Sequence, residues 1–194
     1  APALPIHLFR IRSLSMANLA TTIQAAGLSA SLIVNVLWLT QGWDYSIRTA
    51  GLASAPVPIF VALTAPWVGK LGARYGVRII AVPGSFFWGA GVLMYALFVT
   101  ESPNYWGLWF PASILIAIGV VTTFPIVSAA AVSHVPPAEF SVGGSLNQVG
   151  RQIGATIGVA VLITVVGQGS DLGSFRNAWL ITAGTGPIAA LAIC

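Results

Sequence analysis

The chain has 194 residues, of which 57% are hydrophobic and only 6% are charged, and its formal net charge is +4. A soluble domain carries charge on about a quarter of its residues, so this composition excludes a soluble globular protein. The cations form no stripe with interleaved aromatic residues, which argues against nucleic-acid binding, and a single cysteine excludes an intrachain disulfide framework.

The few charged residues lie at the joints between long apolar runs. No Asp, Glu, Lys or Arg occurs in residues 13–43, 49–69, 79–100 or 102–138. A membrane-spanning helix needs about 20 mostly apolar residues, so the sequence predicts an all-α, polytopic membrane protein. The six predicted transmembrane helices are residues 16–39, 49–68, 79–100, 106–132, 143–166 and 177–194.

Two segments follow from this division. Residues 1–15 are expected to form a cytoplasmic or interfacial lead-in, and residues 16–194 a six-helix transmembrane bundle. The chain begins without Met and stops inside an apolar run. We therefore expect it to be a fragment of a longer polypeptide.

The first predicted helix carries polar side chains on one face. Gln24, Ser31, Asn35 and Trp38 follow one another at spacings of seven, four and three residues, which places them on the same side of a helix. Such a stripe is typical of a substrate cavity, which we expect here. The alternative is that these residues form hydrogen bonds to neighbouring helices inside the bundle.

Residues 69–78, between the second and third predicted helices, form a tight turn that contains glycines and three cations. The simplest interpretation is a basic anchor at the cytoplasmic face. The loop also resembles the signature loop of the major facilitator superfamily, Gly-x-x-x-Asp-Arg-x-Gly-Arg-Arg, with Ala73 at the acidic position. The resemblance implies a gating loop that lacks its acidic residue. The matching residues are Gly69, Arg74, Gly76 and Arg78.

The fifth predicted helix, residues 143–166, has the densest polar content. Asn147 and Arg151 share one face. An arginine inside a membrane is costly and is a functional candidate by default; the alternative is that Arg151 snorkels to the cytoplasmic interface. The helix also carries an adjacent polar stripe and a repeated small-residue pattern, which lets another helix approach closely. The stripe is Gln148, Gln152 and Thr156, and the small residues are Gly150, Gly154 and Gly158.

The distribution of Lys and Arg between the loops indicates the orientation. The positive-inside rule places the more basic side in the cytoplasm. The other side also holds an expected interfacial belt of aromatic residues, which includes Trp106, Trp109 and Trp179. The more basic side carries Arg10, Arg12, Lys70, Arg74 and Arg78, and the opposite side carries Arg48 and Arg176.

Over essentially its whole length the chain resembles the C-terminal six helices of fourteen-helix drug:proton antiporters of the major facilitator superfamily. Residues 147–154 are similar to a stretch near the penultimate helix, and residues 8–18 to the entry of the ninth. The resemblance implies a half-bundle of two inverted three-helix repeats in the cell membrane. It also implies proton-coupled efflux of small hydrophobic or amphipathic compounds by alternating access. The expected partners are the lipid bilayer, a small-molecule substrate, protons and a missing N-terminal half.

No Asp or Glu lies in any predicted helix, so the protonatable carboxylates of such a transporter would lie in the missing half. Two alternatives stay open: a major facilitator transporter of another small solute, and a six-helix scaffold or channel subunit. No metal-ligand spacing, P-loop or nucleophile elbow occurs, so neither a cofactor nor an enzymatic activity is expected. The candidate cavity residues are Gln24, Ser31, Asn35, Trp38, Thr122, Asn147 and Arg151.

Overall fold

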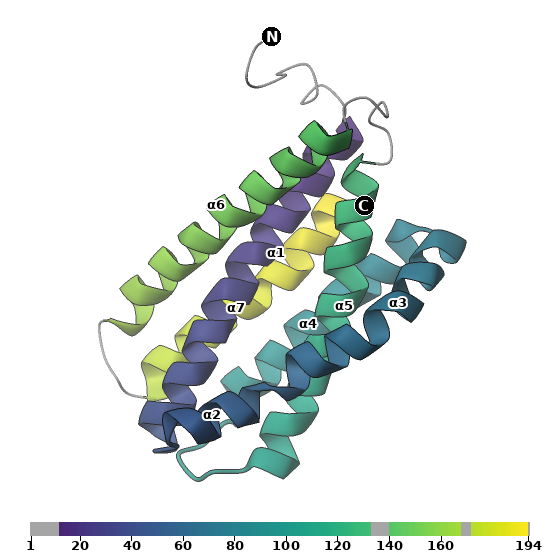
Figure 1. Cartoon of the computed structure of the whole chain (residues 1–194). Coiled ribbons are helices and arrows are strands. Elements are labelled where there is room, and N and C mark those ends of the chain that lie inside the picture. The colour runs from purple at the N-terminus through teal and green to yellow at the C-terminus, as the bar shows by residue number, and fades with distance from the viewer. Residues whose placement is uncertain (1–11, 133–139, 168–171, 194) are drawn as a thin grey trace.

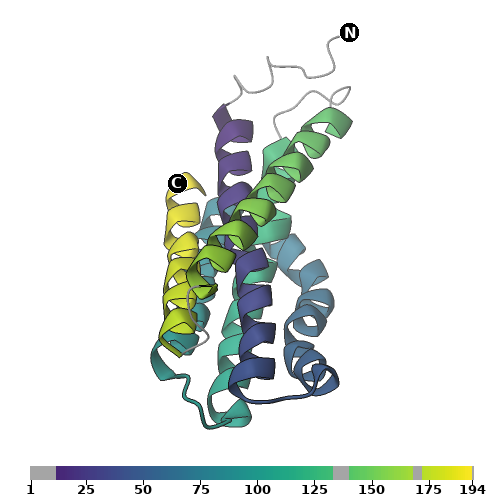
Figure 2. The same cartoon turned by 90° about the vertical axis from the view of Figure 1, so that its left-hand side faces the viewer.

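The computed structural model shows one bundle of long helices that pack side by side (Figures 1 and 2). It describes residues 12–132, 140–167 and 172–193. Most of the predicted lead-in, including Arg10, lies outside this part of the chain. The elements are α1 (Arg12–Leu37), the π-helical turn η2 (Trp38–Gly42), α2 (Ile47–Ser54), α3 (Pro56–Tyr75), α4 (Val77–Phe98), the π-helical turn η3 (Tyr105–Trp109), α5 (Phe110–Val132), α6 (Phe140–Val166) and α7 (Leu172–Ile193).

The second predicted helix is broken in two. α2 ends at Ser54 and α3 begins at Pro56, because proline has no N–H with which to continue a helix but is well suited to a first helical turn. α3 continues to Tyr75, beyond the predicted end at residue 68. It then stops at Gly76, whose φ of 90° lies in a region that favours glycine. This glycine lets α4 start at once in a new direction.

Within the described residues, five helical segments are long and apolar enough to cross a membrane; α7 is not one of them. α7 has the length of a spanning helix, 22 residues, but Arg176, Asn177 and several Gly and Thr residues lower its mean hydropathy. It packs against both α1 and α4. Small side chains suit such a position because they allow close approach on two sides. The sixth helix is therefore present, and the all-helical prediction is confirmed.

The helix contacts have an internal symmetry. When α2 and α3 are counted as one broken helix, the chain divides into two three-helix units that start at opposite ends of the bundle. Exchanging α1 with α5, α3 with α6 and α4 with α7 converts the α1–α6 contact into α3–α5, and the α4–α5 contact into α1–α7. The α4–α7 and α1–α5 contacts convert into themselves. This pattern is that of two inverted repeats.

The symmetry leaves two helices at the flanks. Figure 1 shows α6 along one outer side of the bundle and α3 along the other. Only 6% of the α2–α3 span and 17% of the α6 span is buried, against 44% or more in the spans of α1, α4 and α5. The four helices between the flanks therefore form the core.

Aromatic side chains concentrate in the core at the end of the bundle that holds η2 and η3. The rings of Tyr95 and Trp109 stack with centroids 4.3 Å apart, and Trp38 meets the edge of Phe175 at 5.1 Å. Trp109 and Trp179 are buried, whereas Trp106 is 77% exposed. The predicted interfacial belt is thus wrong for Trp109 and Trp179, which are core residues. Aromatic pairs of this geometry add about 0.5–1.5 kcal/mol each beyond the area that they bury.

α6 lies directly on α1 through its glycines. A Cβ added at Gly154 would meet the carbonyl group of Thr22, and one at Gly158 would meet that of Ala26. The two backbones are therefore in close contact, as the repeated small-residue pattern predicts. This contact fixes the rotation of α6 and hence the direction of every other side chain on it.

Candidate functional site

Most of the polar candidates on α1 lie inside the bundle. Gln24 is only 1% exposed, and its Nε2 donates a hydrogen bond to Thr123 Oγ1 on α5 at 2.6 Å. Asn35 Oδ1 accepts one from the Trp179 indole N–H on α7 at 2.9 Å. These bonds tie α1 to its two neighbours in the core. The geometry is that of helix–helix hydrogen bonding, the alternative raised by the sequence.

Three further candidates are also turned inward. Ser31 and Trp38 are buried, and neither the Ser31 hydroxyl nor the Trp38 indole N–H has a hydrogen-bond partner among the described residues. Thr122 is half-buried, and its hydroxyl donates to the Ile118 carbonyl of its own helix at 2.6 Å. A Cβ added at Gly84 would meet that hydroxyl. Thr122 therefore faces α4, within the core.

Asn147 forms a small polar network with two residues of α1. Its Nδ2 donates to Asn18 Oδ1 at 2.7 Å and to Thr21 Oγ1 at 2.9 Å. All three side chains are buried. Asn18 and Thr21 were not among the predicted site residues. Their spacing of three residues on α1 was the signal, since it puts two hydrogen-bonding groups one above the other on a helix.

Arg151 lies one turn along α6 from Asn147 and is half-buried. Its guanidinium carbon is 5.1 Å from the centre of the Phe124 ring on α5. A cation over an aromatic ring in a partly desolvated place gains about 0.5–2 kcal/mol. The part of the chain that the structure describes gives Arg151 no carboxylate partner. A membrane arginine thus faces α5 with its charge uncompensated by any described acidic group.

The outer surface of α6 is divided lengthwise into a polar row and an apolar row. Gln148, Gln152 and Thr156 are exposed and follow one another at four-residue spacing. The next row round the helix consists of apolar side chains, which are more than half exposed. Lipid accepts the apolar row, but polar side chains at membrane depth face protein or water. The apolar row is Val149, Ile153 and Ile157.

The predicted loop at residues 69–78 is wrong, because α3 continues to Tyr75 and α4 begins at Val77, which leaves only Gly76 between them. The four candidates lie at the end of α3 and the start of α4. Gly69, Arg74 and Arg78 are exposed, and the Arg74 guanidinium carbon is 5.3 Å from the centre of the Tyr75 ring. Gly76 closes the turn by donating its N–H to the Gly72 carbonyl at 3.0 Å. The basic side chains are therefore free to meet water or lipid headgroups. In the described ranges, no group of three His, Cys, Asp or Glu residues could hold a metal ion.

Comparison with known proteins fits this arrangement. The family model of the Major Facilitator Superfamily matches residues 17–194. The multidrug resistance protein B homolog of Mycobacterium tuberculosis is 26% identical over 161 residues, which cover 83% of this chain and 30% of that protein. The lincomycin resistance protein of Streptomyces lincolnensis is 28% identical over 193 residues, which cover 98% of this chain and 40% of that protein. The probable multidrug resistance protein EmrY of Escherichia coli is 25% identical over 173 residues, which cover 88% of this chain and 33% of that protein.

The chain thus spans between 30% and 40% of the length of these three relatives. The match nevertheless includes every helix that the structure describes apart from the first residues of α1. The inverted repeats and the apolar spans agree with it. The chain belongs to the major facilitator superfamily and is a multi-pass membrane protein of that transporter family.

Proposed function

We propose that this chain is one half of a secondary active transporter that exports small hydrophobic or amphipathic compounds by alternating access, driven by proton entry. The observation that carries the proposal is the exposed polar row of α6 beside Arg151. Relatives whose names refer to resistance against several drugs and against lincomycin support the substrate class. Exporters of poorly specified ligands suit largely apolar walls, because apolar contacts discriminate weakly.

The pathway would run between this bundle and a second bundle supplied by the missing N-terminal half. Support comes from the two flanking helices, α3 and α6, which the chain itself hardly covers. On α6, Arg151 points towards α5, and the polar row lies next to it. A partner bundle that covers this side would enclose the polar groups and leave the apolar row to the lipid.

Within this proposal the candidate residues take two roles. Arg151 belongs to the wall of the pathway, with the polar row of α6 beside it. The other candidates, which are buried or half-buried, act behind the wall, where they set the packing of the helices that carry it. These second-row residues are Gln24, Ser31, Asn35, Trp38, Thr122 and Asn147.

The described helices contain no Asp or Glu, so the group that loads and releases the proton would be a carboxylate of the other half. Arg151 would face that carboxylate across the pathway and respond to its charge. An arginine favours the ionised form of a nearby carboxylate and lowers its pKa. Arg151 would thereby help to release the proton.

The end of α3, Gly76 and the start of α4 (residues 69–78) would form the cytoplasmic gate. The support is the clustering of Arg74 and Arg78 at one end of the bundle, since basic loops stay in the cytoplasm. The same orientation would place His134 and Glu139 on this face, but both lie outside the described residues. The proposal places the multi-pass protein in the cell membrane with this face inward.

The direct test is an efflux assay in cells that express the native polypeptide. We expect Arg151→Ala to reduce proton-driven efflux several-fold while membrane insertion is unchanged, and Arg151→Lys to retain more activity. A protonophore should abolish the wild-type efflux. The matched control is Arg48→Ala, which removes an exposed cation elsewhere. Unchanged efflux in Arg151→Ala would reduce Arg151 to a snorkelling anchor.

The missing half has its own test. An antibody against residues 69–78 would report the size of the native polypeptide in membranes. A band at more than twice 20.1 kDa supports a two-bundle transporter. A band at 20.1 kDa would mean that six helices act alone or as an oligomer, and would favour the scaffold or channel alternative.

A further inference from the structure

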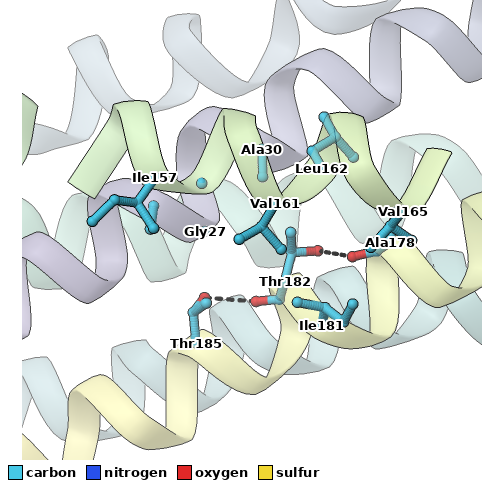
Figure 3. A pocket seen from close by; sticks show the side chains of 12 residues that line it. Gly27, Ala30, Ile157, Val161, Leu162, Val165, Ala178, Ile181, Thr182 and Thr185 are labelled. Atoms are coloured by element: carbon cyan, nitrogen blue, oxygen red, sulfur yellow. Dashed lines mark hydrogen bonds between the residues drawn. The ribbon is translucent and has the colours of Figure 1, made fainter. Parts of the chain in front are cut away.

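A groove with an empty volume of about 480 Å³ lies between α1, α6 and α7. Figure 3 shows side chains of α6 and α7 that project into it from two sides, with α1 behind. On α6 the lining residues Ile157, Val161 and Val165 continue the apolar row that begins at Val149. Arg151 lies on the side of α6 that meets α5. The groove therefore opens on the apolar side of α6, away from the proposed transport pathway.

The groove offers hydrocarbon contacts and no free hydrogen-bond donor. Its two hydroxyl groups belong to Thr182 and Thr185, and both donate to their own helix: Thr182 to the Ala178 carbonyl at 3.0 Å and Thr185 to the Thr182 carbonyl at 2.6 Å (Figure 3). Water needs two or more polar partners to occupy a cavity. An empty groove would forfeit the dispersion contacts of its walls. A hydrocarbon chain needs no polar partner and would supply those dispersion contacts, so it suits the groove.

One end of the groove becomes polar. A second hollow, at the end of α6 and the start of α7, shares Val165 and Ile181 with the first. Its other lining side chains include Thr164, Ser174 and Asn177. Asn177 is exposed and makes no hydrogen bond to another described residue. The two hollows together form an amphipathic site: apolar along its length, and polar but uncharged at one end.

The length of the apolar part corresponds to one leaflet. Ile157 and Val165 both line the groove, and at about 1.5 Å per residue they lie roughly 12 Å apart along α6. The hydrocarbon core of a bilayer is about 30 Å thick, so one leaflet supplies about 15 Å. The polar end coincides with the end of α6.

We propose that this groove binds one phospholipid of the leaflet at the α6–α7 end, with an acyl chain between α6 and α7 and the headgroup at Asn177. Because none of the lining residues is charged, the site fits a zwitterionic or neutral headgroup better than an anionic one. The lipid completes the packing where α1, α6 and α7 meet. The proposal requires only that the chain sits in a bilayer, and it is independent of the transported substrate.

The test is photo-crosslinking in membranes that contain the native polypeptide. The probe is a phosphatidylethanolamine with a diazirine in its acyl chain, and the labelled residues are mapped by peptide mass spectrometry. We expect labelling at Ile157, Val161 and Ile181 to exceed that at Leu97 and Phe98 at least several-fold. The last two are exposed to the bilayer at the same end of the bundle.

Variants separate a bound lipid from the surrounding fluid. Val161→Phe should fill the groove from its rim and remove the excess labelling at Ile181, whereas Leu97→Phe should not. Ile181→Phe fills the groove from the opposite wall and should remove the excess labelling at Val161. This variant replaces Val161→Phe in the test if Val161→Phe folds poorly. Equal labelling at groove and control positions would overturn the proposal. So would labelling that survives both groove variants, or an unlabelled groove covered by another protein segment.

Discussion

α1 and α6 both carry a row of polar side chains on one face, but the two rows have opposite surroundings. On α1, Thr21 and Gln24 are buried and bonded to residues of α6 and α5. On α6, Gln148 and Gln152 lie exposed on the outer face. A polar group in a membrane is stable when another group satisfies it. The α1 residues have that partner within the chain. Under the proposed function, the α6 residues would meet water in the pathway or groups of the missing half.

The contrast also exists within α6 itself. Asn147 is buried in the network with α1, and its sequence neighbour Gln148 is exposed. Likewise Gly154 touches the backbone of α1, whereas a Cβ added at Gly144 would meet nothing within 4 Å. One helix therefore has a structural face and a face that is free to serve transport. Substitutions on the two faces should give separable effects.

The largest effect is expected from the glycines. Gly154→Ala should push α6 away from α1, because the added methyl group meets the Thr22 carbonyl; overpacking costs about 1–3 kcal/mol and sometimes more. Gly144→Ala should be neutral or slightly stabilising. Yield and thermal unfolding midpoint of the purified protein measure both. Equal losses in the two variants would show that α6 does not pack through this face.

The next effect distinguishes neighbouring amides. Asn147→Leu should destabilise the protein by about 1–2 kcal/mol, since it leaves Asn18 and Thr21 without their partner. Gln148→Leu should leave the unfolding midpoint unchanged and reduce efflux. Thermal unfolding and efflux are measured for both variants, so that each variant is the control for the other. A stability loss in Gln148→Leu together with normal efflux would reverse the assignment of the two faces.

The last pair of variants lies at the joint of α3 and α4, where neither face of α6 is involved. Gly76→Ala places a side chain at φ 90° and ψ 156°, a conformation that is essentially restricted to glycine and costs other residues about 1–3 kcal/mol. No atom lies within 4 Å of the added Cβ. Gly69→Ala, in equally open space but within α3, should gain up to about 1 kcal/mol. Thermal unfolding compares the pair. Opposite signs confirm that the α3–α4 joint needs glycine for its backbone alone.

Much of the fold could be predicted because its signals are local. The charge-free runs marked the spans, the glycine spacing marked the close contact of α6, and the density of polar residues marked Asn147 and Arg151. The direction of the α1 stripe could not be predicted. Spacing places Gln24, Asn35 and Trp38 on one face, but it gives only their angles relative to one another. Which way that face points depends on how α1 is rotated against α5 and α7.

The same reasoning explains the aromatic residues and the groove. Trp106 and Trp109 are both tryptophans and lie three residues apart, yet Trp106 is exposed and Trp109 is buried. Both lie in the π-helical segment η3, which turns them to different sides, and composition does not reveal this. The groove arises from three helices that are distant in the sequence. Neither feature has a signal within a single stretch of chain.

The proposed function requires that the polar row of α6 faces a water-filled pathway. Cysteine scanning of α6 tests this directly, in the native polypeptide with its own cysteines, Cys194 among them, replaced by Ser. A membrane-impermeant thiol reagent reacts with thiolates in water and not with thiols in lipid. The account predicts labelling of Gln148→Cys, Gln152→Cys and Thr156→Cys, and none of Val149→Cys, Ile153→Cys and Ile157→Cys. Equal labelling of both rows, or labelling of the apolar row alone, would contradict it.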